Sequence, residues 1–471
     1  MSVEAVLDRS LGLVVAPAGC GKTHLITEAL HIKQEKPYLV LTHTTAGVAA
    51  LKQRLKRLDV PSNNFVVSTI DGWALRVANM FPDSCNIQAT VQNPQTFYPE
   101  LRGKVTNYIS AGHLADIINA SYTRLLVDEY QDCDIQQHKL ICSLSEIIPT
   151  IVFGDPMQCI FNFSGPMPSW NADVISRFPI IAELNVPWRW INSGAEELGQ
   201  WILECRDLLL NGQSINLLGC RDYVQWERLS STPKVNIYNQ NKAQYQIRAT
   251  NNKSDSLLVI GDARNRHSRH NFASLSKGVD VVEPVELADI TEAASNMDIL
   301  DGHELADNIL YSVSLMMTGI GRAKIKKRMS TILAGRSRTP VTNIEQAVKL
   351  VIASSNRESI ANLLSILEQS PDTRVFRKGA FSALKNTIQL AVSEPSKTIL
   401  QCAELIREQR RHQGDKRIPL RAIGSTLLLK GLESEHSLIL DAGVMTPSHL
   451  YVALSRASKS ITVFSNTAFL P

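Results

Sequence analysis

The sequence lacks several features that would place it in other classes of protein. No apolar run approaches the ~20 residues of a membrane span. The first ten residues include Glu4, Asp8 and Arg9, where a signal peptide would be apolar. The eight cysteines form no Cys-x-x-Cys pair, so neither a zinc site nor a disulfide framework is indicated. These absences predict a cytoplasmic protein with reduced thiols and no membrane partner.

Length and charge distribution bound the organisation of the chain. Its 471 residues suggest about two to four domains. The net charge is +4, but residues 301–420 hold 19 Lys and Arg against 11 Asp and Glu, a surplus of 8 that leaves the rest of the chain at −4. This segment is the natural candidate for contact with a polyanion. A solvated helical face explains any single basic cluster about equally well.

The segment Ala16 to Thr23 follows an apolar run and precedes a helical pattern, which predicts a strand, a phosphate-binding loop and a helix. Glycines within it let backbone N–H groups turn inward around phosphates, and the helix N-terminus adds partial positive charge. Lys22 would then reach the β- and γ-phosphates, and the Thr23 hydroxyl would join the Mg²⁺ shell. Ala16 stands where the strict pattern has glycine.

Two further predicted strands end in polar segments. The run Arg124–Val127 leads into Asp128 and Glu129, and Thr150–Phe153 leads into a loop that contains Gln158. One carboxylate can join the Mg²⁺ shell while the next orients or deprotonates water, and an amide can contact the γ-phosphate. A strand that ends in solvated acids is the alternative, but the phosphate loop upstream favours the catalytic interpretation.

Alternating short strands and helices predict an α/β fold with parallel sheets covered on both faces. The pattern becomes irregular from Phe81 to Gly112, which indicates a small insertion. Later strands are expected at Lys234–Tyr238, Ser256–Ile260, Ser437–Leu440 and Ile461–Phe464, with helical periodicity between the second and third. We therefore expect a first sheet domain at 1–77 and 113–183, a small insertion at 78–112, a second sheet domain at 184–300 and 421–471, and a helical basic insertion at 301–420.

Eight short motifs, taken in order, resemble those of the UvrD/Rep/PcrA branch of superfamily 1 helicases. The first four resemble motif I, motif Ia, the Thr-Phe-His-Gly segment and motif II: Ala16 to Thr23, Thr42-His43-Thr44, Thr69 to Ala74, and Asp128 to Asp132. The last four resemble motifs III to VI: Gly154 to Gly165, Trp188-Arg189, Lys430 to Glu433, and Tyr451 to Ala457.

The resemblance implies two RecA-like P-loop domains with ATP and Mg²⁺ between them. The implied catalytic residues are Lys22, Glu129, Gln158, Arg189 and Arg456, and the implied Mg²⁺ ligands are Thr23 and Asp128. The implied nucleotide-binding residues are Ala18, Gly19, Cys20, Gly21, Lys22, Thr23, His24, Trp188 and Glu433. The two arginines would act as arginine fingers from the second domain when the cleft closes, and the cycle of closing and opening would drive movement along a strand.

The resemblance also implies a nucleic-acid side, formed by Thr42, His43, Thr44, Thr69, Phe161, Phe163 and Ser425. Phe163 occupies the family's base-stacking position, although a core phenylalanine remains the alternative. The sequence departs from the family at Ser164 and Leu427, where an arginine and a histidine are usual. It also has no glutamine before Gln34 to contact adenine, so Glu4, or stacking between Trp188 and His24, would hold the base.

These features predict a DNA-dependent ATPase that acts as a single-stranded DNA translocase or helicase, with 3′ to 5′ polarity by family analogy. The trimmed length resembles the small UvrD-like proteins of Gabija-type antiphage systems, which work with an OLD-family ATPase-nuclease. The alternative is an ATP-hydrolysing DNA sensor or regulatory partner of a nuclease that does not unwind DNA, which the departures at Ser164 and Leu427 favour. An RNA helicase is a third interpretation.

Overall fold

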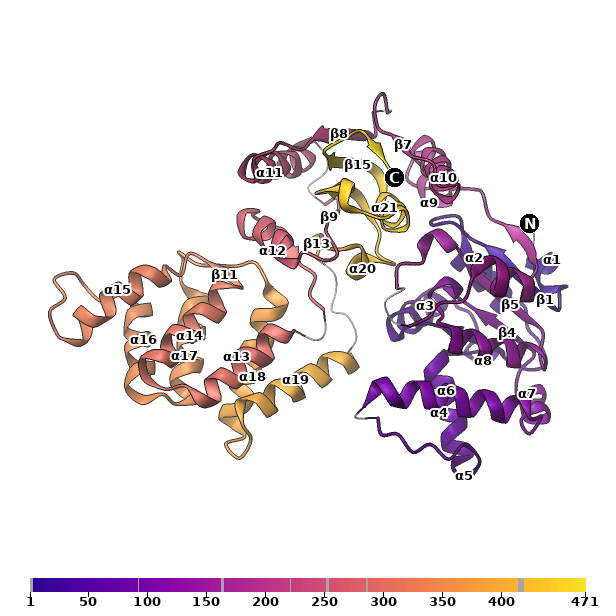
Figure 1. Ribbon diagram of the computed structural model, residues 1–471, viewed down its shortest axis with the longest axis horizontal. Helices are drawn as coiled ribbons and strands as arrows, with labels where there is room; N and C mark the ends of the chain where they lie inside the picture. The colour runs from indigo at the N-terminus through magenta and orange to yellow at the C-terminus, as the bar shows by residue number, and fades with distance from the viewer. Residues whose placement is uncertain are drawn as a thin grey trace. The chain divides into compact units, whose positions relative to one another are not determined.

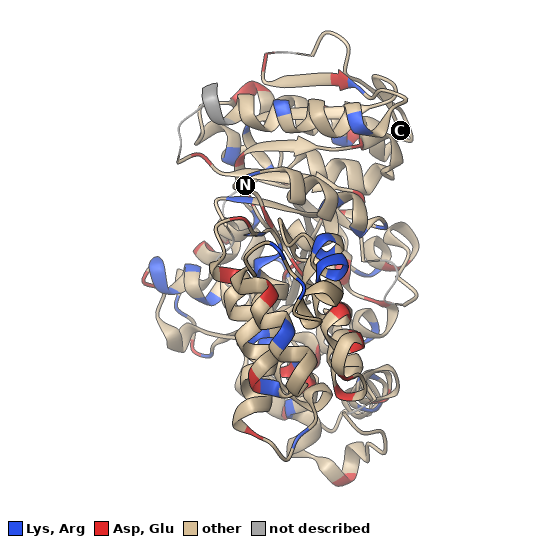
Figure 2. Cartoon of the chain, turned by 90° about the vertical axis from the view of Figure 1, so that its left-hand side faces the viewer, with Lys and Arg blue, Asp and Glu red and all other residues tan. Residues whose placement is uncertain are grey.

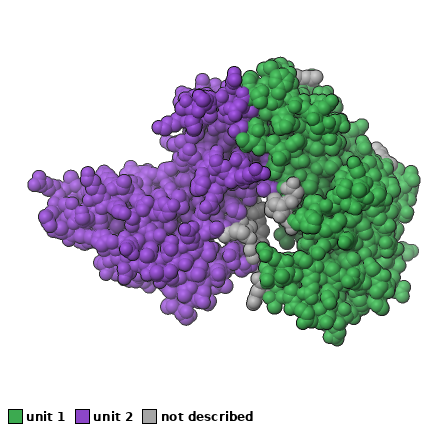
Figure 3. All heavy atoms as spheres, viewed as in Figure 1, with its two compact units in different colours: residues 1–226, 442–461, 467–471 green, residues 227–441, 462–466 purple. Residues whose placement is uncertain are grey.

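Two six-stranded parallel β-sheets with flanking helices organise the computed structural model (Figure 1). The structure describes residues 3–91, 93–161, 165–220, 222–250, 254–284, 287–413 and 419–471. The predicted fold class, α/β with two RecA-like parallel sheets, is confirmed. Two compact units divide the chain: unit 1 comprises residues 1–226, 442–461 and 467–471, and unit 2 comprises residues 227–441 and 462–466 (Figure 3).

The first sheet has the strand order β3-β2-β4-β5-β1-β6. Its strands are β1 (Leu11–Val15), β2 (Tyr38–Thr42), β3 (Phe65–Thr69), β4 (Arg124–Val127), β5 (Thr150–Gly154) and β6 (Ile180–Glu183). All the pairings run parallel, with Val15 opposite Gly154 and Thr42 opposite Thr69. Because parallel strands end at the same edge, the loops that follow β1 to β5 gather there.

Helices cover both faces of this sheet, because successive strand residues point to opposite faces. Val14 and Val40 pack with Ile26 and Leu30 on one face, which is covered by α1 (Val3–Leu7), α2 (Lys22–His31) and α3 (Thr45–Arg57). Leu13 packs with the opposite helices, which are α4 (Ile70–Met80), α6 (Pro94–Ser110), α7 (Ala115–Ser121) and α8 (Ile135–Ser145). The short α5 (Pro82–Cys85) precedes α6.

Unit 1 also contains the segment after β6 and part of the C-terminal region. These parts include α9 (Trp188–Ile191), α10 (Glu196–Leu210), β7 (Ile215–Asn216), β8 (Val224–Arg228), α21 (Pro447–Leu454), β15 (Ala457–Ser465) and β16 (Phe469–Leu470). The short turns are the 3-10 helices η1 (Ser62–Asn64), η2 (Tyr130–Asp132), η3 (Pro156–Gln158) and η5 (Ala442–Val444) and the π-helix η4 (Trp170–Ile175). Helix α21 packs on η3 and on α10.

The second sheet has the order β10-β13-β9-β14-β15-β8. Its strands not yet given are β9 (Leu257–Gly261), β10 (Asp280–Val281), β13 (Arg421–Ser425) and β14 (Ser434–Ile439), and nearby helices are α11 (Pro233–Thr250), α12 (Arg266–Leu275) and α20 (Thr426–Leu429). The predicted strand at Lys234–Tyr238 is wrong, since these residues lie in α11. Gln240 and Gln244 occupy the buried face of that helix, so its helical period is hidden in the hydrophobic pattern.

A helical region in unit 2 has its own core, extending from Leu287 to Ala403. Its helices are α13 (Ala288–Ile299), α14 (Gly302–Ser314), α15 (Arg322–Leu333), α16 (Asn343–Ser354), α17 (Arg357–Gln369), α18 (Lys378–Ser393) and α19 (Ile399–Gln413). The strands β11 (Met317–Thr318) and β12 (Arg374–Val375), which follow α14 and α17 in the chain, form an antiparallel pair. Helical structure across most of 301–420 agrees with the predicted periodicity, and the domain boundaries remain a prediction.

Charges in this helical region are largely interleaved, as Figure 2 shows by the alternation of basic and acidic segments. Arg322 and Lys326 both contact Asp307, at 3.0 and 2.6 Å, and Arg328 contacts Glu345 at 3.1 Å. These pairs neutralise part of the basic surplus. Within the described residues, no helix is both long enough and apolar enough to cross a membrane.

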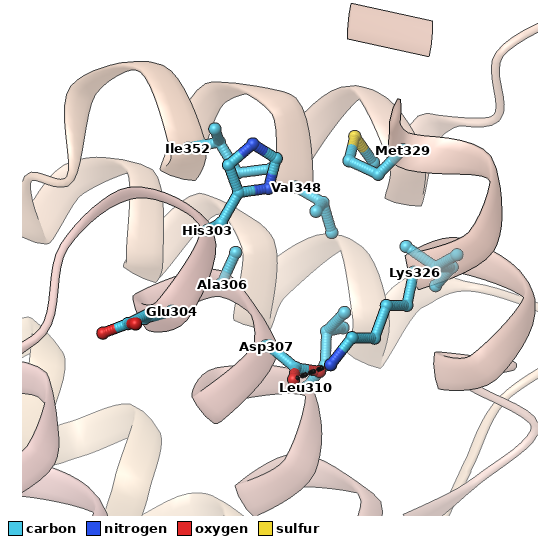
Figure 4. A pocket seen from close by; sticks show the side chains of 10 residues that line it. His303, Glu304, Ala306, Asp307, Leu310, Lys326, Met329, Val348 and Ile352 are labelled. Atoms are coloured by element: carbon cyan, nitrogen blue, oxygen red, sulfur yellow. Dashed lines mark hydrogen bonds and ion pairs between the residues drawn. The ribbon is translucent and has the colours of Figure 1, made fainter. Parts of the chain in front are cut away.

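A pocket of about 200 Å³ lies between α14, α15 and α16 (Figure 4). Its wall includes Leu310, Met329 and Val348, and the Asp307–Lys326 ion pair lies at its lining. The pocket contains neither a glycine-rich loop nor a pair of adjacent acids. The groups predicted to act on ATP lie elsewhere, at the edge of the first sheet.

Candidate active site

The phosphate loop connects β1 to α2 and depends on two glycines with left-handed backbone conformations. Gly19 has φ +73° and Gly21 has φ +93°, and Gly21 caps the N-terminus of α2. A side-chain carbon added at Gly19 would lie 2.6 Å from the ring of Trp190, and one at Gly21 would lie 3.1 Å from Trp188. Glycine is therefore required at both positions by conformation and by space.

Lys22 lies between the two acids that follow β4. Its Nζ is 2.8 Å from Asp128 Oδ1 and 2.5 Å from Glu129 Oε1. Burial would lower the pKa of Lys22, but the two carboxylates raise it above its ordinary value, so the ammonium stays charged. Burial raises the pKa of Asp128, while Lys22 opposes that shift.

Glu129 adopts a conformation that is unusual for a residue with a side chain, with φ +55°. Such conformations persist where the surrounding structure enforces them, and they cluster at functional sites. Here the Gln131 amide donates to Glu129 Oε2 at 2.5 Å, and the backbone N–H of Glu129 donates to Asp128 at 2.9 Å. The carboxylate is thus held beside Lys22 by its own neighbours.

These groups fit a triphosphate with Mg²⁺. Mg²⁺ is usually held by one or two carboxylates together with substrate phosphates and waters. Asp128 supplies a carboxylate beside Lys22, and Thr23 lies in the first turn of the helix that follows the loop. Among the described residues, no group of three or more His, Cys, Asp and Glu side chains could hold a metal by itself.

The loop after β5 adds Gln158. Its Nε2 donates to the carbonyl of Ala16 at 3.4 Å and to Asp155 Oδ2 at 3.1 Å. Gln158 lies in η3, directly after the strand next to β1, and is hydrogen-bonded to the start of the phosphate loop. Three strand ends, those of β1, β4 and β5, thus contribute polar side chains to one edge of the sheet.

Both predicted arginine fingers belong to unit 1, as does Lys22. The backbone N–H of Arg189 donates to the Gly19 carbonyl at 3.1 Å, and its Nη1 donates to the Ser455 carbonyl at 2.5 Å. Arg456 is 3 % exposed, and its Nε and Nη2 donate to the Val452 carbonyl and to Ser455 Oγ, each at 2.9 Å. The structure thus brings Arg189 to the phosphate loop and joins both arginines at the end of α21.

Residues predicted to hold the base lie in different surroundings. Trp188 is half exposed (49 %) beside Gly21, as a stacking surface requires. His24 is exposed on α2 and lies 4.0 Å from Glu28, and Glu4 is exposed on α1. Glu433 lies in unit 2, between α20 and β14. Ala18 and Cys20 are buried within the loop itself.

The predicted nucleic-acid residues of unit 1 lie at the ends of β2 and β3 and beyond β5. The rings of His43 and Phe161 are 5.9 Å apart, and Thr42 is buried at the end of β2. Thr44 Oγ1 and Thr69 Oγ1 accept from backbone N–H groups and cap α3 and α4, at 3.0 and 2.9 Å. A capping hydroxyl accepts through its oxygen and keeps its own hydrogen for donation.

Two of the predicted nucleic-acid residues do not lie in the described part of unit 1. Phe163 lies outside the described residues, as does Ser164. Ser425 lies in unit 2, where its hydroxyl accepts from the Leu428 N–H at 3.4 Å and caps α20.

Several residues of this site were not singled out from the sequence. The Ala18 N–H donates to the buried Tyr451 hydroxyl at 2.9 Å, and Trp190 lies beneath Gly19, with its Nε1 donating to the Ala457 carbonyl at 2.8 Å. Arg206 contacts Asp155 at 3.0 Å. Tyr451, Trp190 and Asp155 lie in or next to motifs that were recognised, whereas Arg206 lies in an ordinary amphipathic helix without a sequence signal.

Comparison with protein-family models agrees with a nucleotide-binding first region. Residues 1–164 match the family model described as an AAA domain. Among solved structures, the chain is similar to the arterivirus nonstructural protein 10 (helicase) in complex with DNA, with 13 % sequence identity and a TM-score of 0.28. The similarity covers 55 % of this chain and about half (51 %) of that chain. No curated protein matches the sequence.

Proposed function

We propose that this protein is a DNA-dependent ATPase that translocates along single-stranded DNA, with 3′ to 5′ polarity. The observation that supports it most strongly is the placement of Lys22 between Asp128 and Glu129 at the edge of a parallel sheet. A phosphate loop, adjacent acids and an amide at three neighbouring strand ends are the parts that ATP hydrolysis needs. The AAA domain match over residues 1–164 supports the same chemistry.

In the proposed reaction, the loop N–H groups and the N-terminus of α2 bind the phosphates, and Lys22 neutralises the β- and γ-phosphates. Thr23 and Asp128 would hold Mg²⁺, which supplies neutralisation of the charge that develops on the transferred phosphoryl group. Glu129 then accepts a proton from the attacking water. Lys22 exchanges its contacts with the two acids for contacts with phosphate, which releases Glu129 for this role.

Arg189 and Arg456 would stabilise charge on the γ-phosphate as arginine fingers, an effect worth about 10³- to 10⁵-fold in rate. Both guanidiniums contact the end of α21, so a turn of their side chains toward the phosphates requires rearrangement there. Hydrolysis removes the charge that they stabilise. The repeated rearrangement at the end of α21, once in each round of hydrolysis, is the proposed source of movement along DNA.

The proposed DNA path follows the ends of β2 and β3. Thr44 and Thr69 would donate to phosphates, and the His43 and Phe161 rings would contact bases, because base stacking on a ring is worth ~1–3 kcal/mol per base. RNA could bind by the same contacts, so a matched RNA strand is part of the test.

The test measures ATP hydrolysis with and without single-stranded DNA. Lys22→Ala and Glu129→Gln should both abolish turnover, and Glu129→Gln should still bind ATP because the loop and Lys22 remain. Arg456→Ala should lower turnover more than nucleotide affinity. Wild-type protein that hydrolyses no ATP in the presence of DNA would refute the proposal.

A second candidate is a DNA sensor that hydrolyses ATP as a timer and signals to a nuclease without unwinding. The leucine at 427 and the serine at 164 favour it, since both remove side chains expected to contact nucleic acid. Strand-displacement assays separate the two, because the motor requires displacement and the sensor does not. The proposed partner for either is an OLD-family ATPase-nuclease of a Gabija-type antiphage system. Co-purification with such a nuclease tests that assignment.

A further inference from the structure

Asp155, the residue after β5, is a carboxylate with no exposed surface at all (0 %). Its Oδ1 accepts from Arg206 Nε at 3.1 Å and from Nη2 at 3.0 Å, and also from the Met157 N–H at 3.2 Å. Its Oδ2 accepts from Gln158 at 3.1 Å. Every one of these partners is a donor, as an ionised carboxylate requires.

Arg206 supplies the positive charge that pairs with Asp155. A buried charge is tolerated in a protein when it is paired and its remaining lone pairs are satisfied. Arg206 lies on α10 and is itself 8 % exposed. Burial would lower its pKa, but Asp155 raises it above the ordinary value, so Arg206 stays charged. Fifty-one positions separate the two residues in the chain.

This pair determines which way the Gln158 amide is turned. The two groups that meet Gln158 on this side are the Asp155 carboxylate and the Ala16 carbonyl, at 3.1 and 3.4 Å. Both are acceptors without hydrogens, so the atom facing them must be the NH₂ group. The Oε1 acceptor is consequently turned the other way, which is the polarity needed to accept a hydrogen bond from water.

Asp155 also leads back to the other proposed catalytic group. Its backbone N–H donates to Gln131 Oε1 at 3.2 Å, and Gln131 Nε2 donates to Glu129 at 2.5 Å. Gln131 is therefore oriented by the same loop that carries Gln158. One buried polar chain joins Arg206, Asp155 and Gln158 on one branch and Glu129 on the other.

We infer that Arg206 is a positioning residue for hydrolysis, which acts through Asp155 to fix the orientation of the Gln158 amide. The inference rests on the proposed function, because it concerns the same nucleotide site. It assigns a role in the reaction to a helix that no motif marks. Arg206 donates to Asp155 and to Asp207, and Asp155 in turn accepts from Gln158, so Asp155 links Arg206 to the Gln158 amide.

The decisive experiment is a double-mutant cycle between Arg206 and Gln158, measured as ATP turnover and KM. Arg206→Met should lower kcat by ~10- to 100-fold, the scale of a misplaced catalytic group, and leave KM for ATP within about twofold of wild type. In a Gln158→Ala background the same substitution should change kcat by less than about twofold, because its target is gone. An equal loss in both backgrounds would overturn the inference.

Two further variants keep the test valid if Arg206→Met folds poorly because it leaves Asp155 unpaired. Arg206→Lys keeps the charge and loses the two-point contact, so it should lower kcat by an intermediate factor. Asp155→Asn combined with Arg206→Met removes both charges, restores folding and should still lower kcat at unchanged KM. Wild-type kcat in both variants would also overturn the inference.

Arg177→Met is the matched control. Its guanidinium is partly buried in unit 1 and donates to the Cys142 carbonyl and Ser145 Oγ, away from Gln158. It should leave both kcat and KM unchanged. Wild-type protein without any hydrolysis would refute the proposed function itself. If the wild type hydrolyses ATP normally and Arg206→Met has the same kcat and KM, only the positioning role is refuted.

Discussion

Arg102 and Asp71 form a two-point ion pair, with Nε 2.6 Å from Oδ1 and Nη2 2.7 Å from Oδ2. The third nitrogen, Nη1, lies 2.5 Å from Asp134 Oδ2. One guanidinium of α6 therefore connects the first turn of α4 to the N-cap of α8. Asp71 lies two residues after Thr69, a proposed DNA contact, and Asp134 follows the acids of the proposed ATP site, so the two segments are fixed to each other.

Arg102→Met should destabilise unit 1 by ~2 kcal/mol. This is less than the ~3–5 kcal/mol for breaking a fully buried pair, because the three side chains keep 13–23 % of their surface exposed. Urea unfolding measures the loss. Arg76→Met, on the exposed side of α4, is the control and should change stability by less than ~0.5 kcal/mol. Equal stability of both variants would contradict the role of the ion pair.

Tyr451→Phe should weaken the phosphate loop. The substitution leaves the buried Ala18 N–H without its acceptor, at a cost of ~1–3 kcal/mol. We expect a lower unfolding free energy together with a raised KM for ATP. Tyr223→Phe removes a hydroxyl that donates to the Glu197 carbonyl, away from the loop, and should leave KM unchanged. An unchanged KM in Tyr451→Phe would show that the hydroxyl does not support the loop.

Base selectivity should be low, because the proposed base contacts are rings rather than a glutamine side chain. Rates for ATP and GTP should differ by less than ~100-fold, the discrimination of one good two-point hydrogen-bonded contact. Trp188→Ala should raise KM for both nucleotides by a similar factor of about 10, since stacking is indifferent to the base. Steady-state assays with the two nucleotides measure this. A much larger effect on ATP than on GTP would indicate a specific adenine contact instead.

Unit 2 should lose stability in mild acid through His270. Burial lowers the pKa of His270 to about 3, and the neighbouring cations Arg377 and Arg269 add to the shift. The unfolded chain takes up a proton near pH 6.5 while the folded chain does not, so stability falls as the pH drops below that value. Between pH 7.5 and 5 the loss should be ~2 kcal/mol from this group.

The comparison that isolates this effect is His270→Asn, which cannot take up the proton. Thermal unfolding at the two pH values should show a smaller acid loss in the variant than in the wild type. Burial opposes ionisation of Asp289, but the hydrogen bond and charge of Arg377 lower its pKa below the ordinary value, so the stability that it contributes is lost only in more acid solution than pH 5. Identical acid losses would disprove the assignment to His270.

Local patterns predicted much of the first sheet and of the phosphate site. The strand at Arg124–Val127 and the helix after the phosphate loop occur at the predicted places, because apolar runs and loop glycines act within a few positions. The structure of the segment from Phe81 to Gly112 was less predictable. Its prolines suggested irregular structure, yet α6 begins at Pro94 and continues through Pro99, where tertiary packing outweighs local preference.

Contacts between distant segments could not be predicted. Tyr451 meets Ala18 across 433 positions, and Arg206 meets Asp155 across 51. Neither pair leaves a periodic signal, because each depends on which helix is packed against which loop. Helix α11 was also not predicted, because buried glutamines interrupt its apolar face. Sequence motifs marked the chemical groups, and the packing determined how those groups are oriented.

The contact of Lys22 with two carboxylates has a consequence for the order in which ligands arrive. A triphosphate that entered alone would bring its negative charges against Asp128 and Glu129 and would at the same time draw Lys22 away from both carboxylates. If a divalent cation arrived with the nucleotide, Asp128 would be placed to hold it, and the cation would supply the positive charge that Lys22 gives up. Nucleotide stripped of its cation should therefore be excluded from this loop, and discrimination against it is built into the resting protein.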